Sequence, residues 1–386
     1  MKKLFYIPGV MLVLFSLILT IIVSTAHKDT PSGTFAKNEK ELSNCQTIVK
    51  NHDRELCYLK IVEHFDIKNI SSYVKDIELK DGFKGSCHMV LHELGDHYSK
   101  TYSKEDLLIN YKLDMDICQA GFLHGIQEGY AKHEGSKGIM EMSLIFCSME
   151  VIPREASCLH GVGHAYSLTT DTPTKVAKEC TNLTDALIVK YPQLNYEKER
   201  VNFYVKCSEG YFMKTFNDHR ERYQGMTLNT VNKVCESDQV SAEAICKIAI
   251  FRPYITQLTD PSLNPDFDNK VATVRRYQER IKEMNQYCET LEADYINNCY
   301  FTKGTAVFDR YNYNSDHSPA TANKVFNDCK EEAFCYKGYF FSLLTPSAVK
   351  YPTKEYLAEF CRDEVCIAER DASLAFVTYD KDITRR

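Results

Sequence analysis

Histidine residues are concentrated in one stretch of this chain, and their spacing is typical of metal ligands. Seven of the 12 histidines lie between residues 88 and 164. Within this stretch three pairs of potential ligands stand four residues apart, so the members of each pair share one face of a helix. The pairs are His88 with His92, His124 with Glu128, and His160 with His164. Three neighbouring helices with such pairs would build a mono- or dinuclear metal centre.

The chemistry of such a centre sets the first hypothesis about function. Imidazole-rich sites suit zinc, copper or iron, and they generate a nucleophilic water or bind oxygen. We therefore expect a metal-dependent enzyme, either a hydrolase or an oxidoreductase. Glu128 and Glu93 are the candidates for acid–base catalysis or for orienting imidazoles. The expected metal ligands are His88, His92, His124, His160 and His164.

The string from His92 to His97 is similar to the zincin motif because a glutamate, Glu93, follows its first histidine. Its two histidines are five residues apart, however, and the zincin motif needs a spacing of four. On a helix the second histidine would therefore point away from the face that carries the first. The string does not predict a zincin site.

Two other strings resemble parts of lanthionine-synthetase cyclases, whose α/α toroid binds zinc through Cys and Cys-His-Gly ligands. These strings are His124-Gly125 and Cys158-Leu-His160-Gly161. The resemblance covers only these few residues, and the sequence departs from the pattern in the extra residue between Cys158 and His160. It implies an architecture of paired helices and no activity.

The cysteines indicate a chain cross-linked by disulfides. Their number, 16, is even and high, which is typical of oxidising compartments. A cytosolic zinc protein would instead need Cys-x-x-Cys pairs, and the sequence has none. Hairpin loops between helices bring two Cα atoms within the roughly 4.4–6.8 Å that a disulfide requires. The expected pairs are Cys45–Cys57, Cys87–Cys118, Cys147–Cys158, Cys180–Cys207, Cys235–Cys246, Cys288–Cys299, Cys329–Cys335 and Cys361–Cys366.

In each short pair we expect the first cysteine to end one helix and the second to begin the next. The pattern Cys-x-x-Gly-apolar follows the cysteines at positions 118, 158, 207 and 335. Glycine costs a helix about 1 kcal/mol, so its recurrence predicts close contact between helix backbones. Helical periodicity elsewhere completes the prediction, which is an all-α fold of disulfide-stapled helical-hairpin repeats that form an α-solenoid or an α/α toroid.

The repeats divide into two kinds. The sixth residue after the opening cysteine is His124 or His164 in the early repeats but Met213 or Phe341 in the later ones. If packing alone required histidine at this position, all copies would tend to carry it. The segment from residue 87 to 164 is therefore expected to carry the function, and the later repeats to complete the framework.

The N-terminus has the features of an export signal. Lysines at positions 2 and 3 precede an apolar stretch over residues 5–23. Ser24 and Ala26 are small enough for a signal-peptidase site, while the length of the stretch also suits a membrane anchor. Residues 1–26 are thus expected to be a signal peptide or a signal anchor. Either one places the body of the chain outside the cytoplasm, secreted or membrane-anchored.

The remaining sequence predicts a polar linker over residues 27–44, a single helical repeat domain over 45–378 and a polar tail over 379–386. A net charge of −6 argues against nucleic acid or an anionic membrane surface as the partner. The expected partner is an unknown small molecule or a peptide, with membrane contact only through an uncleaved N-terminal segment.

Two alternatives to an enzyme remain at this stage. One is a disulfide-stapled helical scaffold that binds a protein or peptide without catalysis, with histidines that cap or hydrogen-bond helix ends. The other is metal storage or delivery, which needs the same ligands but no turnover.

Overall fold

A computed structural model describes residues 40–68, 70, 87–110, 117–147, 152–192, 196–219, 225–259, 264, 268–312, 319–329, 332–344 and 360–384. The chain divides into two compact units, Met1–Ile61 and Val62–Arg386. The expected export segment and most of the expected linker lie outside the described residues. The domain boundaries stay predictions.

The described residues contain helices and no strand, which confirms the predicted all-α class. None of these helices is both long and apolar enough to cross a membrane. The helices are α3 (Asn51–Val62), α5 (Cys87–Thr101), α6 (Lys104–Asn110), α7 (Ile117–Phe146), α8 (Ile152–Ser167), α9 (Pro173–Lys190), α10 (Arg200–Asp218), α12 (Leu228–Val234), α13 (Val240–Thr256), α14 (Lys270–Cys288), α15 (Ala293–Asn312), α16 (Pro319–Cys329), α17 (Ala333–Leu344) and α19 (Glu364–Thr384), with short 3-10 turns at Tyr196–Glu199 and Gln257–Thr259.

The first unit is small. A disulfide joins Cys45 to Cys57, and the side chains of Leu42 and Tyr58 are buried. Arg54 on α3 donates a hydrogen bond to the carbonyl oxygen of Ile48.

Seven of the eight expected disulfides are present, with Cα–Cα distances of 5.3–5.7 Å. Cys87 is also disulfide-bonded, but the side chain of its expected partner, Cys118, lies outside the described residues. Seven intrachain disulfides point to an oxidising, extracytoplasmic environment.

The expectation that the second cysteine of a short pair begins a helix is wrong for several pairs. Cys158 lies six residues after the start of α8, and Cys246 and Cys299 lie equally deep in α13 and α15. The helices start earlier because the six residues before each of these cysteines already have helical backbone. The disulfides therefore join the end of one helix to the second turn of the next.

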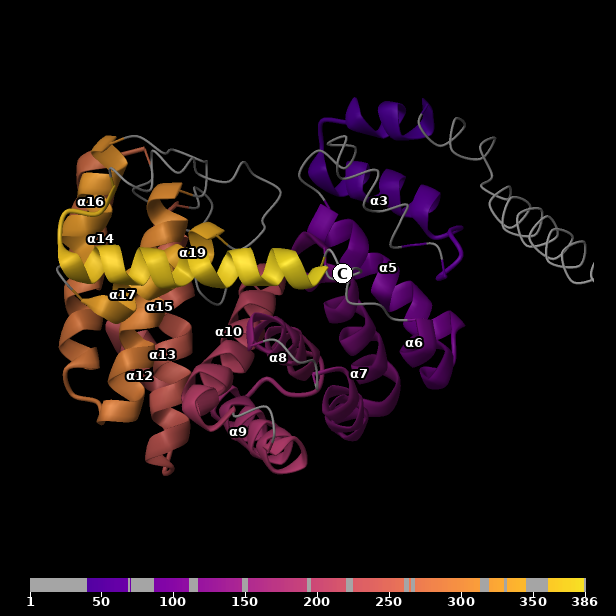
Figure 1. Ribbon diagram of the computed structural model, residues 1–386, viewed down its shortest axis with the longest axis horizontal. Helices are drawn as coiled ribbons and strands as arrows, with labels where there is room; N and C mark the ends of the chain where they lie inside the picture. Colours follow the sequence, from indigo (N-terminus) through magenta and orange to yellow (C-terminus); the bar gives the residue numbers. More distant parts are fainter. Residues whose placement is uncertain are drawn as a thin grey trace, which may run out of the picture. The chain divides into compact units, whose positions relative to one another are not determined.

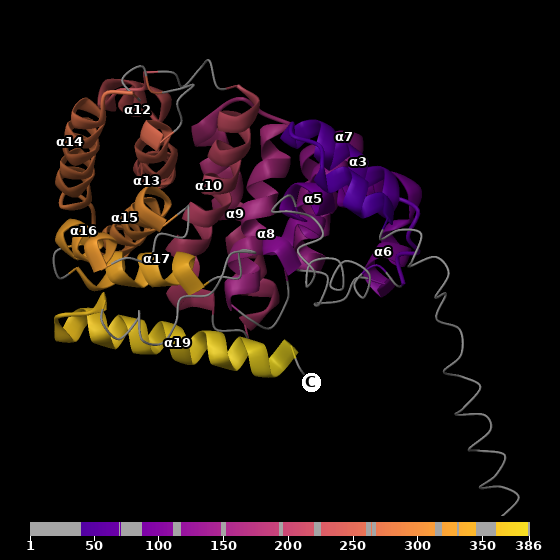
Figure 2. The same ribbon diagram turned by 90° about the horizontal axis from the view of Figure 1, so that it is seen from above.

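In the second unit, helices pack against one another in a series (Figure 1). The series runs α5, α7, α8, α10, α13, α15, α17 and α19, and each member contacts the next. Figure 2 shows the last of these contacts, where α19, in yellow, runs beside α17. Helices α9, α12, α14 and α16 connect members of this series. Whether the series forms a solenoid or a toroid stays a prediction.

Glycines allow the backbones in this series to touch, as the Cys-x-x-Gly pattern predicts. A Cβ atom at Gly210 on α10 would overlap the carbonyl oxygen of His160 on α8. A Cβ atom at Gly338 on α17 would overlap the carbonyl oxygen of Phe301 on α15. Any larger residue would push these helices apart.

Candidate metal centre

The three helices that carry the histidine pairs are held at close range by glycine. A Cβ atom at Gly125 on α7 would overlap the carbonyl oxygen of His92 on α5. On α8, a Cβ atom at Gly161 would overlap the side chains of His124 and Gln127. These glycines therefore bring α5, α7 and α8 together and leave room for the ring of His124. The local sequence thus sets the distances within the site.

Three ligand atoms meet in the space between these helices. Nε2 of His92, Oε1 of Glu128 and Nδ1 of His164 lie 3.3 Å from one another in all three pairings. All three residues are buried, with no more than 5% of their surface exposed. We call these residues the inner set, and they form a group that could hold a metal ion.

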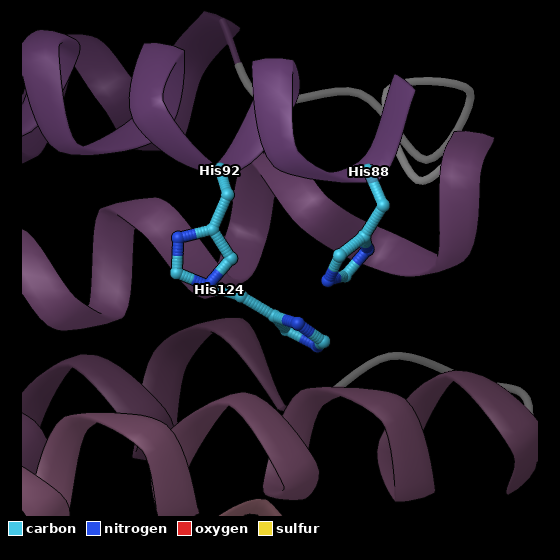
Figure 3. A group of neighbouring side chains, drawn as sticks. All are labelled: His88, His92 and His124. Carbon is cyan, nitrogen blue, oxygen red and sulfur yellow. The ribbon is translucent and has the colours of Figure 1, made fainter. Parts of the chain in front are cut away.

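A second group with converging ligand atoms consists of His88, His92 and His124. Figure 3 shows the rings of His88 and His92, which descend from α5, and the ring of His124 in the same space. The ring centres of His88 and His124 are 5.5 Å apart. His160 completes the cluster, with its ring centre 5.7 Å from that of His124 and 4.9 Å from that of His164. The structure thus brings all five predicted ligands together.

Two buried nitrogen atoms of the cluster have no hydrogen-bond partner within the described part of the chain. They are Nδ1 of His124 and Nε2 of His164. The other nitrogen of His124, Nε2, lies 2.9 Å from the carbonyl oxygen of Ser157, so it must donate its proton there. Nδ1 of His124 is therefore unprotonated and offers its lone pair to the cluster, as a metal ligand does.

The protonation states of the cluster suit a metal ion. Burial lowers the pKa of His92 to about 3 and holds the pKa values of His124 and His160 well below 6.5. Burial opposes ionisation of Glu128, but a hydrogen bond with His164 and electrostatic interactions with His92, His164 and Lys214 favour the carboxylate and lower its pKa to about 2. Neutral imidazoles and an ionised carboxylate are the forms that bind divalent metals.

Lys214 on α10 is a site residue that the sequence analysis missed. Its Nζ lies 3.4 Å from Oε2 of Glu128 and 3.6 Å from Oδ2 of Asp218. The two carboxylates raise the pKa of Lys214 against the effect of burial. Lys214 stands four residues after Gly210, which contacts α8, so the shared helix face was a signal that could have identified it.

The sequence analysis also missed a buried charge network beside the cluster. Oε2 of Glu209 on α10 lies 2.7 Å from Nζ of Lys206 and 3.7 Å from the guanidinium of Arg252 on α13. Arg252 also binds Asp309 on α15 through two nitrogen atoms, at 2.8 and 3.2 Å. The charges of Lys206 and Arg252 contribute to the low pKa of His160, after burial and His164. The network balances two positive charges with two negative ones.

Glu93 is not part of the cluster. It is exposed on α5 and belongs to neither group of converging ligand atoms among the described residues. Asp96, one turn further along α5, is buried and binds Lys132 at 2.8 Å and also Lys100. The acidic residues of α5 thus stand apart from the histidines.

The described chain is a disulfide-rich helical protein with a buried His/Glu group that could hold a metal ion. No protein family model, curated protein or solved structure matches it.

Proposed function

We propose that this protein is a zinc-dependent hydrolase that acts outside the cytoplasm, with the ion bound by His92, Glu128 and His164. One observation carries the proposal, namely the three equal distances of 3.3 Å between the ligand atoms of the inner set. Three ligands of a tetrahedral zinc ion, at bond lengths of about 2.0–2.1 Å, lie about 3.3–3.4 Å apart. The inner set matches this spacing.

The same distances favour zinc over the other expected metals. Neighbouring ligands of a square-planar or octahedral ion, at similar bond lengths, lie only about 2.8–3.0 Å apart. Two imidazoles and one carboxylate are also a ligand set of catalytic zinc sites, in which the fourth position holds water. Under this proposal Glu128 is a ligand and not the acid–base catalyst expected from the sequence.

The proposed reaction is hydrolysis. His92, Glu128 and His164 would hold the zinc ion, which would supply as nucleophile a water whose pKa is lowered to about 7. The bond between the carbon or phosphorus of the substrate and its leaving group would be cleaved, with the hydroxyl group added to the carbon or phosphorus and the proton added to the leaving group. Zinc has no redox chemistry, so the proposal selects a hydrolase over an oxidoreductase.

Metal analysis tests the ion directly. We expect protein that is purified in oxidised form without chelator to contain stoichiometric zinc, and His164→Ala and Glu128→Gln to lose it, because each removes one of three buried ligands. His133→Ala is the matched control, since His133 is exposed on α7 and lies outside the cluster. A wild-type protein without stoichiometric metal would contradict the proposal and favour the scaffold alternative.

The catalytic part of the proposal has its own test. We expect wild-type protein to hydrolyse at least one of a panel of chromogenic esters, amides and phosphate esters. A chelator should abolish this activity, and added zinc should restore it. Protein that binds zinc stoichiometrically but hydrolyses nothing in a chelator-sensitive manner would contradict hydrolysis and favour metal storage.

A further inference from the structure

We propose that the cluster holds a second divalent ion, bound by His88, His124 and His160. We call these three residues the outer set. The inference extends the proposed function, because it adds an ion beside the proposed zinc, but it depends on different side chains.

The placement of the six ligand residues supports two sets. Each of the three helices contributes one residue to each set, and on every helix the two residues are four positions apart. Four residues rise by about 6 Å along a helix, which is about one turn. The outer residues therefore occupy one turn on α5, α7 and α8, and the inner residues occupy the next turn. A single ion with three or four ligands would leave at least two of these residues unused.

The outer set has its own converging nitrogen atoms. His88 and His124 each place a ring nitrogen within 4.8 Å of the other. His92 belongs to the same group, but its Nε2 already faces the inner set at 3.3 Å from both partners. His160 is the remaining imidazole beside His124, with its ring centre 5.7 Å away, and under this proposal it supplies the third ligand.

The tautomer of His124 favours a ligand role in the outer set. Ser157 fixes the proton on Nε2, and the opposite nitrogen is buried without a hydrogen-bond partner within the described residues. Leaving such a buried atom unsatisfied costs free energy, and a metal ion would remove this cost. The ring centre of His124 lies 5.5 Å from that of His88 and 5.7 Å from that of His160, and Figure 3 shows the rings of His88 and His124 in the same space.

The two sets differ in solvent access and in charge. His88 and His160 are partly exposed, whereas all three inner residues are buried. The outer ligands are all neutral imidazoles, so an ion bound there keeps its full positive charge. Its open coordination positions would therefore attract an anionic oxygen, either hydroxide or a phosphate or carboxylate oxygen of a substrate. Pairs of metal ions use this arrangement to bind the attacking oxygen and the substrate together.

The experiment is a titration of chelator-stripped, oxidised full-length protein with Zn²⁺, followed by calorimetry and by elemental analysis after removal of free metal. We expect two ions per wild-type chain. His124→Ala and His88→Ala should lose the ion of the outer set and retain the ion of the inner set. His164→Ala should lose the ion of the inner set. His133→Ala, exposed on α7, should retain both. Helical content and the absence of titratable thiols establish that each variant is folded.

The results separate this inference from the proposed function. One ion in the wild-type chain that His164→Ala removes and His124→Ala does not would overturn the second ion and leave the proposed zinc intact. One ion lost in both variants would mean a single ion shared by both sets, which also overturns the inference. If the wild-type chain binds no ion, both proposals fail.

Discussion

At the scale of single residues, neighbouring side chains contact the proposed ligands. Oε1 of Glu128 faces His92 and His164, and Lys214 contacts the other oxygen, Oε2, at 3.4 Å. Nε2 of His124 likewise contacts Ser157. Partners of this kind determine the tautomer and direction of the ligands they contact.

Lys214→Met tests this role. We expect the variant to bind zinc about 10–100-fold more weakly than wild type, because Oε2 of Glu128 loses its partner and the carboxylate is free to rotate. Lys137→Met is the control, since Lys137 is an exposed lysine on α7 that contacts Glu141. Competition with a chelator measures both affinities. Equal affinity in the Lys214 variant and the wild type would show that the ion pair does not orient the ligand.

Asp96 gives a prediction for pH. Burial opposes ionisation of Asp96, but hydrogen bonds from Lys100 and Lys132 lower its pKa below the usual value of 3.8. Because the folded pKa is the lower one, these contacts stabilise the fold at neutral pH, and their contribution is lost as the pH falls below that value. We expect Asp96→Asn to reduce the free energy of unfolding at pH 7 and to have less effect near pH 3, measured by denaturant titration. An equal effect at both pH values would contradict this account.

The cluster of histidines with Glu128 could be predicted from the sequence because helical spacing places i and i+4 on one face. All five predicted histidines and Glu128 meet in the structure. The roles of the carboxylates could not be derived in the same way. Whether Glu93 or Glu128 faces the cluster depends on which side of each helix is buried, and Lys214 comes from a helix without a histidine. Such contacts require the packing of α10 against α8.

At the scale of elements, the disulfides determine where each helix stands relative to the next. Cys147–Cys158 joins the end of α7 to the second turn of α8. Gln127 on α7 donates a hydrogen bond to the carbonyl oxygen of Cys158, at 3.2 Å. His160 follows two residues later, so this disulfide cross-links the part of α8 that carries the proposed ligands.

Removing this bond separates its effect on the site from its effect on the fold. We expect Cys147→Ser with Cys158→Ser to lower the free energy of unfolding by about 2–4 kcal/mol and also to weaken metal binding. Cys361→Ser with Cys366→Ser removes a disulfide at α19, which does not belong to the cluster. This control should lose stability without loss of metal affinity. Equal metal affinity in both double variants would contradict a positioning role for Cys147–Cys158.

The disulfide pairing could be predicted because short sequence separations leave few geometric choices. The helix starts were predicted less well, since the sequence does not show how far α8, α13 and α15 extend before their cysteines. The extra turns form because no glycine or proline blocks the helix between its first residue and Cys246 or Cys299.

At the scale of the whole second unit, the buried contents of the helix series change along the chain. Histidine side chains lie between α5, α7 and α8. Further along the series, the ion pairs of Glu209 with Lys206 and Arg252, and of Arg252 with Asp309, lie on α10, α13 and α15. Near the end of the series, aromatic side chains contact one another, as in the stacked rings of Tyr339 on α17 and Phe360. That the early repeats carry the function and the later ones complete the framework stays a prediction.

The disulfide between α7 and α8 has a further consequence for the order of events during maturation. Under the proposed function, His160 and His164 on α8 would take their positions only after Cys147 and Cys158 are oxidised, a step that a reducing cytoplasm prevents. An exported chain would then acquire its metal only after oxidation. The ion it binds would depend on the metals available in the compartment where oxidation occurs.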